Sequence, residues 1–283
     1  MKKKARFQAD LHCHTTASDG SLRPGEIVEL AYSKGLKAIA ITDHDTIDGW
    51  QEAEEVANRL PIKVIRGVEV NTDWQKREIH ILGYLLDEES GSFNSRIKEL
   101  QEKRKIRIKE ILSKLKLFKI DITFEEVMQY AKGNSIGRPH VAQAIVHKGY
   151  ARDFREAFDN YLRIGSPAYV PRYKLTPTEA IRLIRDAKGI PVLAHPGAQR
   201  IDKEINLWIE DGLQGIEVYH PEHSCEDSLR YNAMAEKLGL IATGGSDFHG
   251  KSIKTGIDIG DKGVNLEVVD QLERLKQKYI YNY

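Results

Sequence analysis

Cysteine is scarce in this sequence. Only Cys13 and Cys225 occur among 283 residues, and a chain of this length built for an oxidising compartment would usually carry more. We therefore expect both thiols to be reduced. The opening MKKK resembles the charged start of a signal peptide, but no apolar stretch long enough for an h-region follows it. No run approaches the roughly 18 uninterrupted apolar residues of a membrane span either. These absences predict a cytoplasmic protein that does not enter a membrane.

Neither sign of charge is in excess. The 43 Lys and Arg residues nearly equal the 42 Asp and Glu residues, so we expect no stable binding of duplex nucleic acid, and any attraction for anions must be local. The motifs of covalent catalysis are missing as well, since the chain has no GxSxG elbow and no reactive-cysteine signature. The sequence does not indicate an oligomeric state.

The chain does contain short apolar, β-branched runs that alternate with amphipathic helical stretches. This alternation is typical of βα units and a parallel sheet. One helix has clear signals at both ends: Thr176, Pro177 and Glu179 form a capping box with proline in the first turn, and Gly189 is expected to close the helix. The seven candidate strands are 6–11, 38–42, 63–70, 78–85, 191–195, 215–219 and 240–245.

The connection between the fourth and fifth strands is too long for a simple βα unit. It spans about 105 residues, whereas βα loops normally have roughly two to six residues plus a helix. Residues 92–120 form one long amphipathic pattern, and RPHVAQAIVHKG and DFREAFDNYLRIG predict two further helices. We therefore expect residues 1–94 and 169–283 to form one barrel domain, with residues 95–168 as a helical insertion over one end of the sheet.

Side chains that can bind metals gather at the ends of the predicted strands, except for His80, which lies within the fourth strand. Because the carboxyl ends of barrel strands form one active face, residues from the whole sequence should converge there. Imidazole and carboxylate groups are ligands of Zn, Mn, Fe or Co, and a set this large implies two or three ions. For any single histidine, a hydrogen-bonded structural role is the alternative. The candidate ligands are His12, His14, Asp19, His44, Glu69, His80, His195, Asp247 and His249.

Four short motifs that contain candidate ligands resemble, in this order along the chain, the motifs of the PHP (polymerase and histidinol phosphatase) superfamily. They are HCH at His12 to His14, ITDHD ending at Asp45, AHPG beginning at Ala194, and SDFH ending at His249. The longer stretch from DLHCHTTASDG to ITDHDT, together with IGRPHVA, is similar to the stand-alone branch of nucleotide phosphatases and short-oligonucleotide exonucleases. The resemblance implies an α/β fold, a distorted (β/α)7 TIM-like barrel with an inserted helical subdomain.

The resemblance also implies how the ligands are divided among three cations, which could be Mn, Zn or Fe. It assigns His12, His14, Glu69 and Asp247 to the first ion. Glu69, His80 and His195 would hold the second, with Glu69 bridging. Asp19, His44 and His249 would hold the third.

Metals spaced for a shared water would make hydroxide the attacking group on phosphorus, with no side-chain nucleophile. Asp247 would serve this catalytic centre, and His220 could donate a proton to the leaving group or bind phosphate. Asp43 and Asp45 are expected to support the ligands or to cap helices. The candidates for binding substrate phosphate are Arg138, His140, Lys174 and Arg200.

Three functions are therefore open. The first is a metal-dependent phosphoesterase for nucleotides, acting on nucleoside 3',5'-bisphosphates or on 5'-phosphorylated short oligonucleotides. The second is a histidinol-phosphate phosphatase, which needs an acidic pocket for the ammonium group of its substrate. The third is a metal-binding regulatory module without catalysis, against which the complete ligand set argues.

Overall fold

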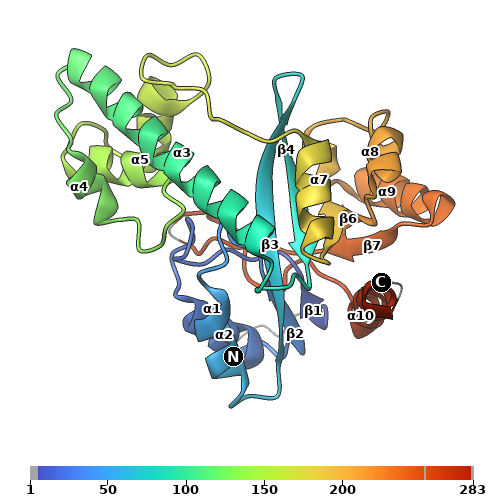
Figure 1. Cartoon of the computed structure of the whole chain (residues 1–283). Coiled ribbons are helices and arrows are strands. Elements are labelled where there is room, and N and C mark those ends of the chain that lie inside the picture. The colour runs from blue at the N-terminus through green and yellow to red at the C-terminus, as the bar shows by residue number, and fades with distance from the viewer. Residues whose placement is uncertain (1–5, 252, 282–283) are drawn as a thin grey trace.

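The computed structural model describes residues 6–251 and 253–281 (Figure 1), so the MKKK segment lies outside the described residues. Seven strands follow one another around a single sheet in chain order. The sheet is nearly closed, because the Leu11 amide of the segment after the first strand donates to the Gly244 carbonyl of the last, at 3.2 Å. The strands are β1 (Ala9–Asp10), β2 (Ala38–Ile41), β3 (Lys63–Trp74), β4 (Arg77–Tyr84), β5 (Ile190–Leu193), β6 (Gly215–Tyr219) and β7 (Ile241–Gly244).

The expectation of an all-parallel sheet is wrong for β4, which runs antiparallel to both β3 and β5. Only Gln75 and Lys76 separate β3 from β4, and a parallel crossover needs roughly a dozen residues or more. Both turn residues have positive φ, 52° and 66°, as a tight two-residue hairpin requires. β3 also continues past the predicted end at residue 70, and the long hairpin rises above the rest of the barrel in Figure 1.

Among the described residues, the α-helices that accompany the barrel strands are α1 (Pro24–Ser33), α2 (Trp50–Ala57), α7 (Pro177–Asp186), α8 (Ile205–Asp211), α9 (Cys225–Leu238) and α10 (Leu266–Tyr281). The predicted capping box of α7 is confirmed, since Thr176 Oγ1 accepts from the Glu179 amide at 3.2 Å. The left-handed residue after α7 is Lys188, with φ 52°, and not Gly189. Glycine is needed at 189 for space, because a Cβ there would lie 2.9 Å from Leu86 Cγ.

Side chains on the two faces of the strands belong to separate hydrophobic clusters, because successive side chains of a strand point to opposite faces. Ile39, Ile41 and Val68 belong to a cluster that includes the outer helices. Ile65 and Leu82 belong to the other, which includes α10. Glu69 lies four residues after Ile65, and His80 two before Leu82. Each therefore shares the face of its strand that carries the second cluster.

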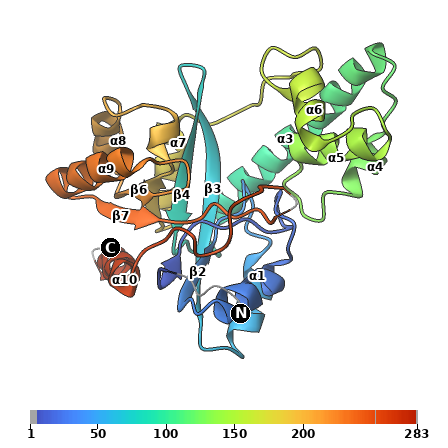
Figure 2. The ribbon, with the colours of Figure 1, turned by 180° about the vertical axis from the view of Figure 1, so that it is seen from behind.

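The long connection is helical, with α3 (Gly91–Leu117), α4 (Phe124–Met128), α5 (Arg138–His147), α6 (Phe154–Ala157) and a π-helical turn over Phe158–Leu162. These helices share a third hydrophobic cluster, formed by residues between 108 and 170. The first half of α3 packs instead in the barrel, through Phe93, Ile97 and Leu100. Figures 1 and 2 show α4, α5 and α6 grouped around the far half of α3. Within the described ranges, no helix combines the length and apolar character needed to cross a membrane.

Candidate metal centre

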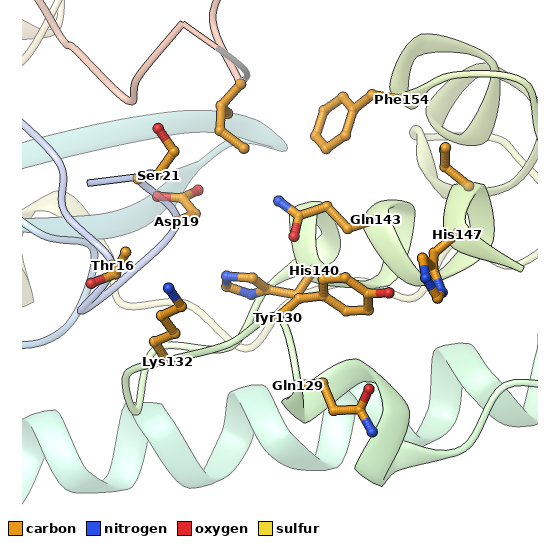
Figure 3. Close-up of a pocket in the computed structure, with 13 residues that line it drawn as sticks. Thr16, Asp19, Ser21, Gln129, Tyr130, Lys132, His140, Gln143, His147 and Phe154 are labelled. Atoms are coloured by element: carbon orange, nitrogen blue, oxygen red, sulfur yellow. The ribbon is translucent and has the colours of Figure 1, made fainter. Parts of the chain in front are cut away.

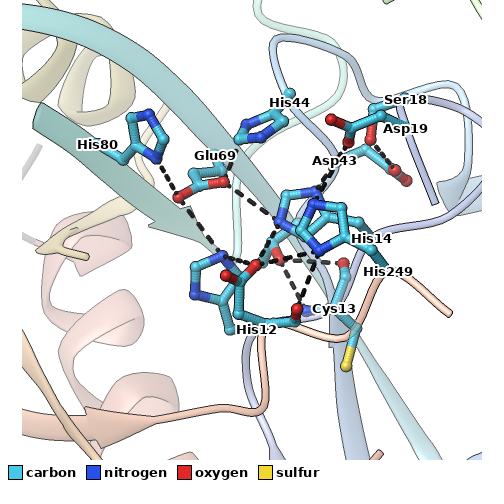
Figure 4. Close-up of polar contacts among 12 residues, drawn as sticks. His12, Cys13, His14, Ser18, Asp19, Asp43, His44, Glu69, His80 and His249 are labelled. Atoms are coloured by element: carbon cyan, nitrogen blue, oxygen red, sulfur yellow. Dashed lines mark hydrogen bonds and ion pairs between the residues drawn. The ribbon is translucent and has the colours of Figure 1, made fainter. Parts of the chain in front are cut away.

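Glu69 lies at the middle of a cluster of histidines at the barrel rim (Figure 4). It is 1% exposed, and its backbone pairs with Leu82 of β4, so the hairpin holds it rigidly. Its Oε1 lies 2.8 Å from His80 Nδ1 and 3.2 Å from His195 Nε2. Its Oε2 lies 2.9 Å from His44 Nδ1 and 3.2 Å from His14 Nε2. One carboxylate thus joins imidazoles from four separate segments of the chain.

Asp247 is the second carboxylate of the cluster and stands in the loop after β7, with φ 51°. Its Oδ1 lies 3.3 Å from His14 Nε2 and 3.5 Å from His12 Nε2. Asp19 is the third, and its Oδ1 lies 3.5 Å from His249 Nε2. All nine residues predicted as ligands are therefore brought into one contiguous cluster.

The ionisable groups of this cluster are strongly perturbed. Burial alone would lower the pKa of His14, but the carboxylates of Asp247 and Glu69, 3.3 and 3.2 Å from its Nε2, raise it to about 10. Likewise, burial lowers and Glu69 raises the pKa of His80, with the outcome at about 9. Burial would raise the pKa of Glu69, yet the histidines around it, His80 foremost, hold that pKa well below its usual range. The carboxylates of the cluster thus raise the pKa of His14 and His80, whereas burial lowers the pKa of His44 and His220.

The cluster fits divalent cations by its free atoms and by its chemistry. Several buried atoms have no hydrogen-bond partner within the described part of the chain: His12 Nε2, His14 Nδ1 and Nε2, Asp19 Oδ1, His195 Nδ1 and His220 Nε2. All are imidazole nitrogens or a carboxylate oxygen, the donors that Zn, Mn and Fe accept. Four groups have ligand atoms within 4.8 Å of one another: His14 with Asp19, His44 and His249; His12 with His220 and Asp247; His12 with His14 and Glu69; and His44 with Glu69 and His80.

His220 lies inside this cluster. It is fully buried, and its Nε2 is 3.4 Å from Asp247 Oδ2. The structure therefore makes His220 a tenth candidate ligand, in a group with His12 and Asp247. Its expected service as a proton donor or a phosphate ligand remains a prediction.

Carboxylates behind the cluster orient it, and sequence reasoning missed the most important one. Glu217 of β6 is fully buried; its Oε1 lies 3.0 Å from His12 Nδ1 and its Oε2 accepts from the His195 amide at 2.9 Å. The signal in the sequence was the single acid in the apolar strand GIEVY, because a buried carboxylate has to be paired. The expected supports also have contacts, since Asp43 accepts from Thr15 Oγ1 at 2.7 Å and Asp45 from the Asn71 amide at 3.0 Å.

The four predicted phosphate-binding residues lie in different places. Arg138 lines a cavity of about 250 Å³ beside Asp19, His44 and His80. His140 lines a neighbouring cavity of about 540 Å³, which also reaches Asp19, and its Nδ1 accepts from the Gly137 amide at 3.0 Å. Lys174 lies 3.4 Å from Glu78 Oε2. Arg200 lines a separate depression with Asp202 and Arg230.

Three cations near the cluster were not anticipated. Arg104 and Arg172 line the 250 Å³ cavity together with Arg138. Lys254 Nζ lies 2.6 Å from Asp247 Oδ2. Arg104 sits in the charged face of a long helix, where the sequence pattern indicates a solvated side chain, and Arg172 is two residues from the lysine that the sequence singled out.

A barrel that gathers buried imidazoles and carboxylates at its rim defines a class, the metal-dependent hydrolases. The model of the PHP domain family matches residues 10–170. A 3',5'-nucleoside bisphosphate phosphatase of Chromobacterium violaceum is 34% identical over 257 residues, 89% of this chain and 90% of that protein. A 5'-3' exoribonuclease of Haemophilus influenzae is 32% identical over 95% of this chain and 98% of its own.

A solved structure agrees with these relatives. A Bifidobacterium adolescentis protein described as a metal-dependent phosphoesterase superposes with a TM-score of 0.89 at 30% identity, over 96% of this chain and 98% of that one. The chain belongs to the PHP domain family. It is a phosphoesterase of that family, and the distorted barrel expected from its motifs is confirmed.

Proposed function

We propose that this protein hydrolyses phosphate esters of nucleotides, either nucleoside 3',5'-bisphosphates or 5'-phosphorylated short oligonucleotides. The relatives described above are named for substrates of these kinds. The observation that carries the proposal in this chain is the 540 Å³ cavity, which shares Asp19 with the metal centre. A substrate with its phosphate at the centre can extend directly into that space.

The walls of this cavity suit a nucleobase. Figure 3 shows Gln143 and Phe154, from the inserted helices, facing Asp19 and Ser21 of the barrel loop across the opening. Tyr130 lines the cavity as well. Aromatic rings stack on bases with a gain of about 1–3 kcal/mol each, and a side-chain amide can hydrogen-bond the edge of a base. The cavity therefore supports a nucleoside substrate over a plain phosphate ester.

Two or three divalent cations, which could be Mn, Zn or Fe, are proposed for the centre, held by the nine predicted ligands with His220 in addition. Such ions lower the pKa of water toward neutrality and neutralise phosphate charge. The protein side chains fix the geometry: Glu217 sets the orientation of His12, and Glu69 links the two halves of the cluster. Lys254, beside Asp247, supplies a cation at the edge of the site.

Charge disfavours the histidinol-phosphate alternative. That substrate carries an ammonium group, whereas in the smaller cavity beside the centre three arginines, Arg104, Arg138 and Arg172, outnumber two acids, Asp19 and Glu78. The regulatory module without catalysis is unsupported, because the relatives are named as enzymes.

We also propose that residues 95–168 form a helical subdomain over the barrel made by residues 1–94 and 169–283. The separate hydrophobic cluster supports this division from Ile108 onward, whereas Ile97 and Leu100 pack with the barrel. A cytoplasmic location with reduced thiols remains our prediction. It is in keeping with two cysteines that are both unpaired, Cys13 buried and Cys225 exposed.

The direct test is phosphate release from adenosine 3',5'-bisphosphate, from a 5'-phosphorylated dinucleotide and from histidinol phosphate, with Mn²⁺ added and then removed by a chelator. We expect turnover of the two nucleotides only, lost on chelation and restored by metal. Phe154→Ala should raise KM for the nucleotides by about 5- to 150-fold, the equivalent of a lost stacking interaction. Activity that survives complete metal removal, or a preference for histidinol phosphate, would contradict the proposal.

A further inference from the structure

A lysine outside the predicted ligand set contacts the candidate metal centre. Lys254 Nζ lies 2.6 Å from Asp247 Oδ2. The next acid within reach among the described residues is Glu222, whose Oε1 lies 3.7 Å from the same nitrogen. Asp247 is itself a candidate ligand. The ammonium group of Lys254 and a divalent cation therefore compete for one carboxylate.

Asp247 does not depend on Lys254 for a partner. Its Oδ1 lies 3.3 Å from His14 Nε2 and 3.4 Å from His249 Nδ1. Its Oδ2 lies 3.4 Å from His220 Nε2. These imidazoles can donate a hydrogen bond to the carboxylate or hold a cation together with it. In either case the carboxylate has partners without the lysine, so pairing with Asp247 does not by itself account for Lys254.

Lys254 approaches Asp247 from the open side of the centre. Its side chain is 30% exposed, whereas the side chains of His12 and His220 are fully buried. The neighbouring residue, Ile253, lines the 540 Å³ cavity in which the nucleoside is proposed to bind. The stem of a lysine side chain is long and flexible. A ligand that reaches the centre through this cavity therefore comes within range of the ammonium group.

The backbone that carries Lys254 is anchored to the barrel. The Ser21 amide donates to the His249 carbonyl at 2.8 Å, and the Lys254 amide donates to the Gly250 carbonyl at 3.0 Å. The ring of His249 stacks on that of His14, with centres 4.1 Å apart (Figure 4). The base of the lysine side chain is therefore held at the centre, while its ammonium group can move between neighbouring anions.

When Asp247 ligates a divalent cation, the charge of Lys254 loses its strong partner. The ammonium group then faces a like charge across the same carboxylate, and this interaction is repulsive. Glu222 is a poor substitute, because an ion pair at 3.7 Å with an acid that is 48% exposed contributes little. An anion that enters the centre compensates the charge. The phosphoryl group of the proposed substrate is such an anion, and lysine binds phosphate oxygens well as a point charge.

We propose that Lys254 is a catalytic residue, whose ammonium group moves from Asp247 to an oxygen of the phosphoryl group that is hydrolysed. This inference rests on the proposed function and adds a residue to its mechanism. The lysine keeps its proton, so no covalent bond forms or breaks at its nitrogen. Its positive charge stabilises the negative charge that the phosphoryl oxygens carry during the attack of hydroxide.

The test is a split between metal affinity and catalysis in Lys254→Met. In calorimetry without substrate, the variant should bind Mn²⁺ about 2- to 5-fold more tightly than the wild type, since it lacks a partly exposed competing charge. In the Mn²⁺-loaded variant, the affinity for inorganic phosphate and kcat/KM for adenosine 3',5'-bisphosphate should each fall about 10- to 150-fold, the value of a charge-assisted hydrogen bond. Lys254→Arg should recover part of both losses, because it keeps the charge.

Lys251→Met is the matched control. Lys251 lies on the same segment, is 77% exposed and pairs only with Asp258 among the described residues, so all three measurements should stay at wild-type values. Circular dichroism shows whether each variant folds. If Lys254→Met binds Mn²⁺ no more tightly than the wild type, or binds phosphate as well as the wild type, the inference is overturned. If the split in affinities is found but the wild type hydrolyses no phosphate ester, the anion contact of Lys254 stands and the proposed function fails.

Discussion

Replacing Glu217 with glutamine should perturb the metal centre while every candidate ligand stays unchanged. The side chain is fully buried in β6, and it accepts a hydrogen bond from the backbone amide of His195 at 2.9 Å. Its other oxygen lies 3.0 Å from His12 Nδ1, which leaves His12 Nε2 directed at Glu69 and Asp247, 3.4 and 3.5 Å away. A carboxylate behind a ligating histidine fixes the ring and raises its basicity. Glutamine keeps the shape and removes the charge.

The size of the effect follows from the environment of the carboxyl. Burial would raise the pKa of Glu217, but His12, His220 and His195 lower it from the ordinary 4.5 to about 2. That difference corresponds to about 3 kcal/mol. Since the pKa is depressed, this stabilisation is present above pH 4.5 and is lost as the pH falls toward 2. At pH 7 the metal-free Glu217→Gln protein should lose up to about 3 kcal/mol of unfolding free energy.

Metal affinity should fall in the same variant, by about 10- to 100-fold, as is usual when the partner of a ligating histidine is removed. Calorimetric titration of the metal-free protein with Mn²⁺ measures this, and urea unfolding measures the stability. Glu236→Gln is the matched control, because Glu236 is exposed on α9. If Glu217→Gln binds Mn²⁺ as tightly as the wild type, Glu217 does not orient His12, and the reasoning is refuted.

Three further predictions follow from the same cluster and its supports. Burial lowers the pKa of His14, but nearby carboxylates raise it from 6.5 to about 10. The stability of the metal-free protein in urea should therefore fall as the pH rises from 6.5 to about 10. A stability that does not change with pH over this range would contradict the raised pKa of His14. Arg104→Met leaves the buried Asp45 without a cation, although the Asn71 amide still donates to it, and should cost about 3–5 kcal/mol in urea unfolding; a loss under 1 kcal/mol would show a weak pair. A Cβ at Gly245 would lie 2.3 Å from His12 Cβ, so Gly245→Ala should weaken Mn²⁺ binding in calorimetry with the far-ultraviolet dichroism unchanged; wild-type affinity would show that His12 does not move.

Much of the fold could be predicted because local signals agree with it. Each observed strand lies within or close to a predicted apolar run, and the capping box places the start of α7 at Pro177. The direction of β4 could not be predicted in this way. Two-residue hairpins are usually signalled by Gly, Asn or Asp, and here Gln75 and Lys76 take the positive φ values instead. The hydrogen bonds of the long hairpin, and not turn propensity, hold these residues in place.

The unpredicted antiparallel direction of β4 also affects how the candidate ligands are placed. Placing ligands at strand ends works for His12, His44 and Asp247, which do follow β1, β2 and β7. It fails for Glu69, which lies inside β3 and not at its end, and it does not apply to His80, which lies within β4 as expected. They meet because Asn71 pairs with His80 across an antiparallel register, which puts the side chain of His80 next to that of Glu69. For His80 the family resemblance supplied what strand position could not.

Arg104 shows why the substrate side of the site escaped sequence reasoning. In the sequence it belongs to a charged stretch of a long helix, and such a stretch usually faces solvent. Docking of α3 buries it against Asp45, the residue after His44, so the position of the insertion is tied to the loop that carries a candidate ligand. The barrel thus supplies the candidate metal ligands, while α3 and α5 supply Arg104 and Arg138 to the cavity beside them. Substitutions in the lining contributed by the insertion should therefore change which phosphate ester is preferred before they change metal affinity.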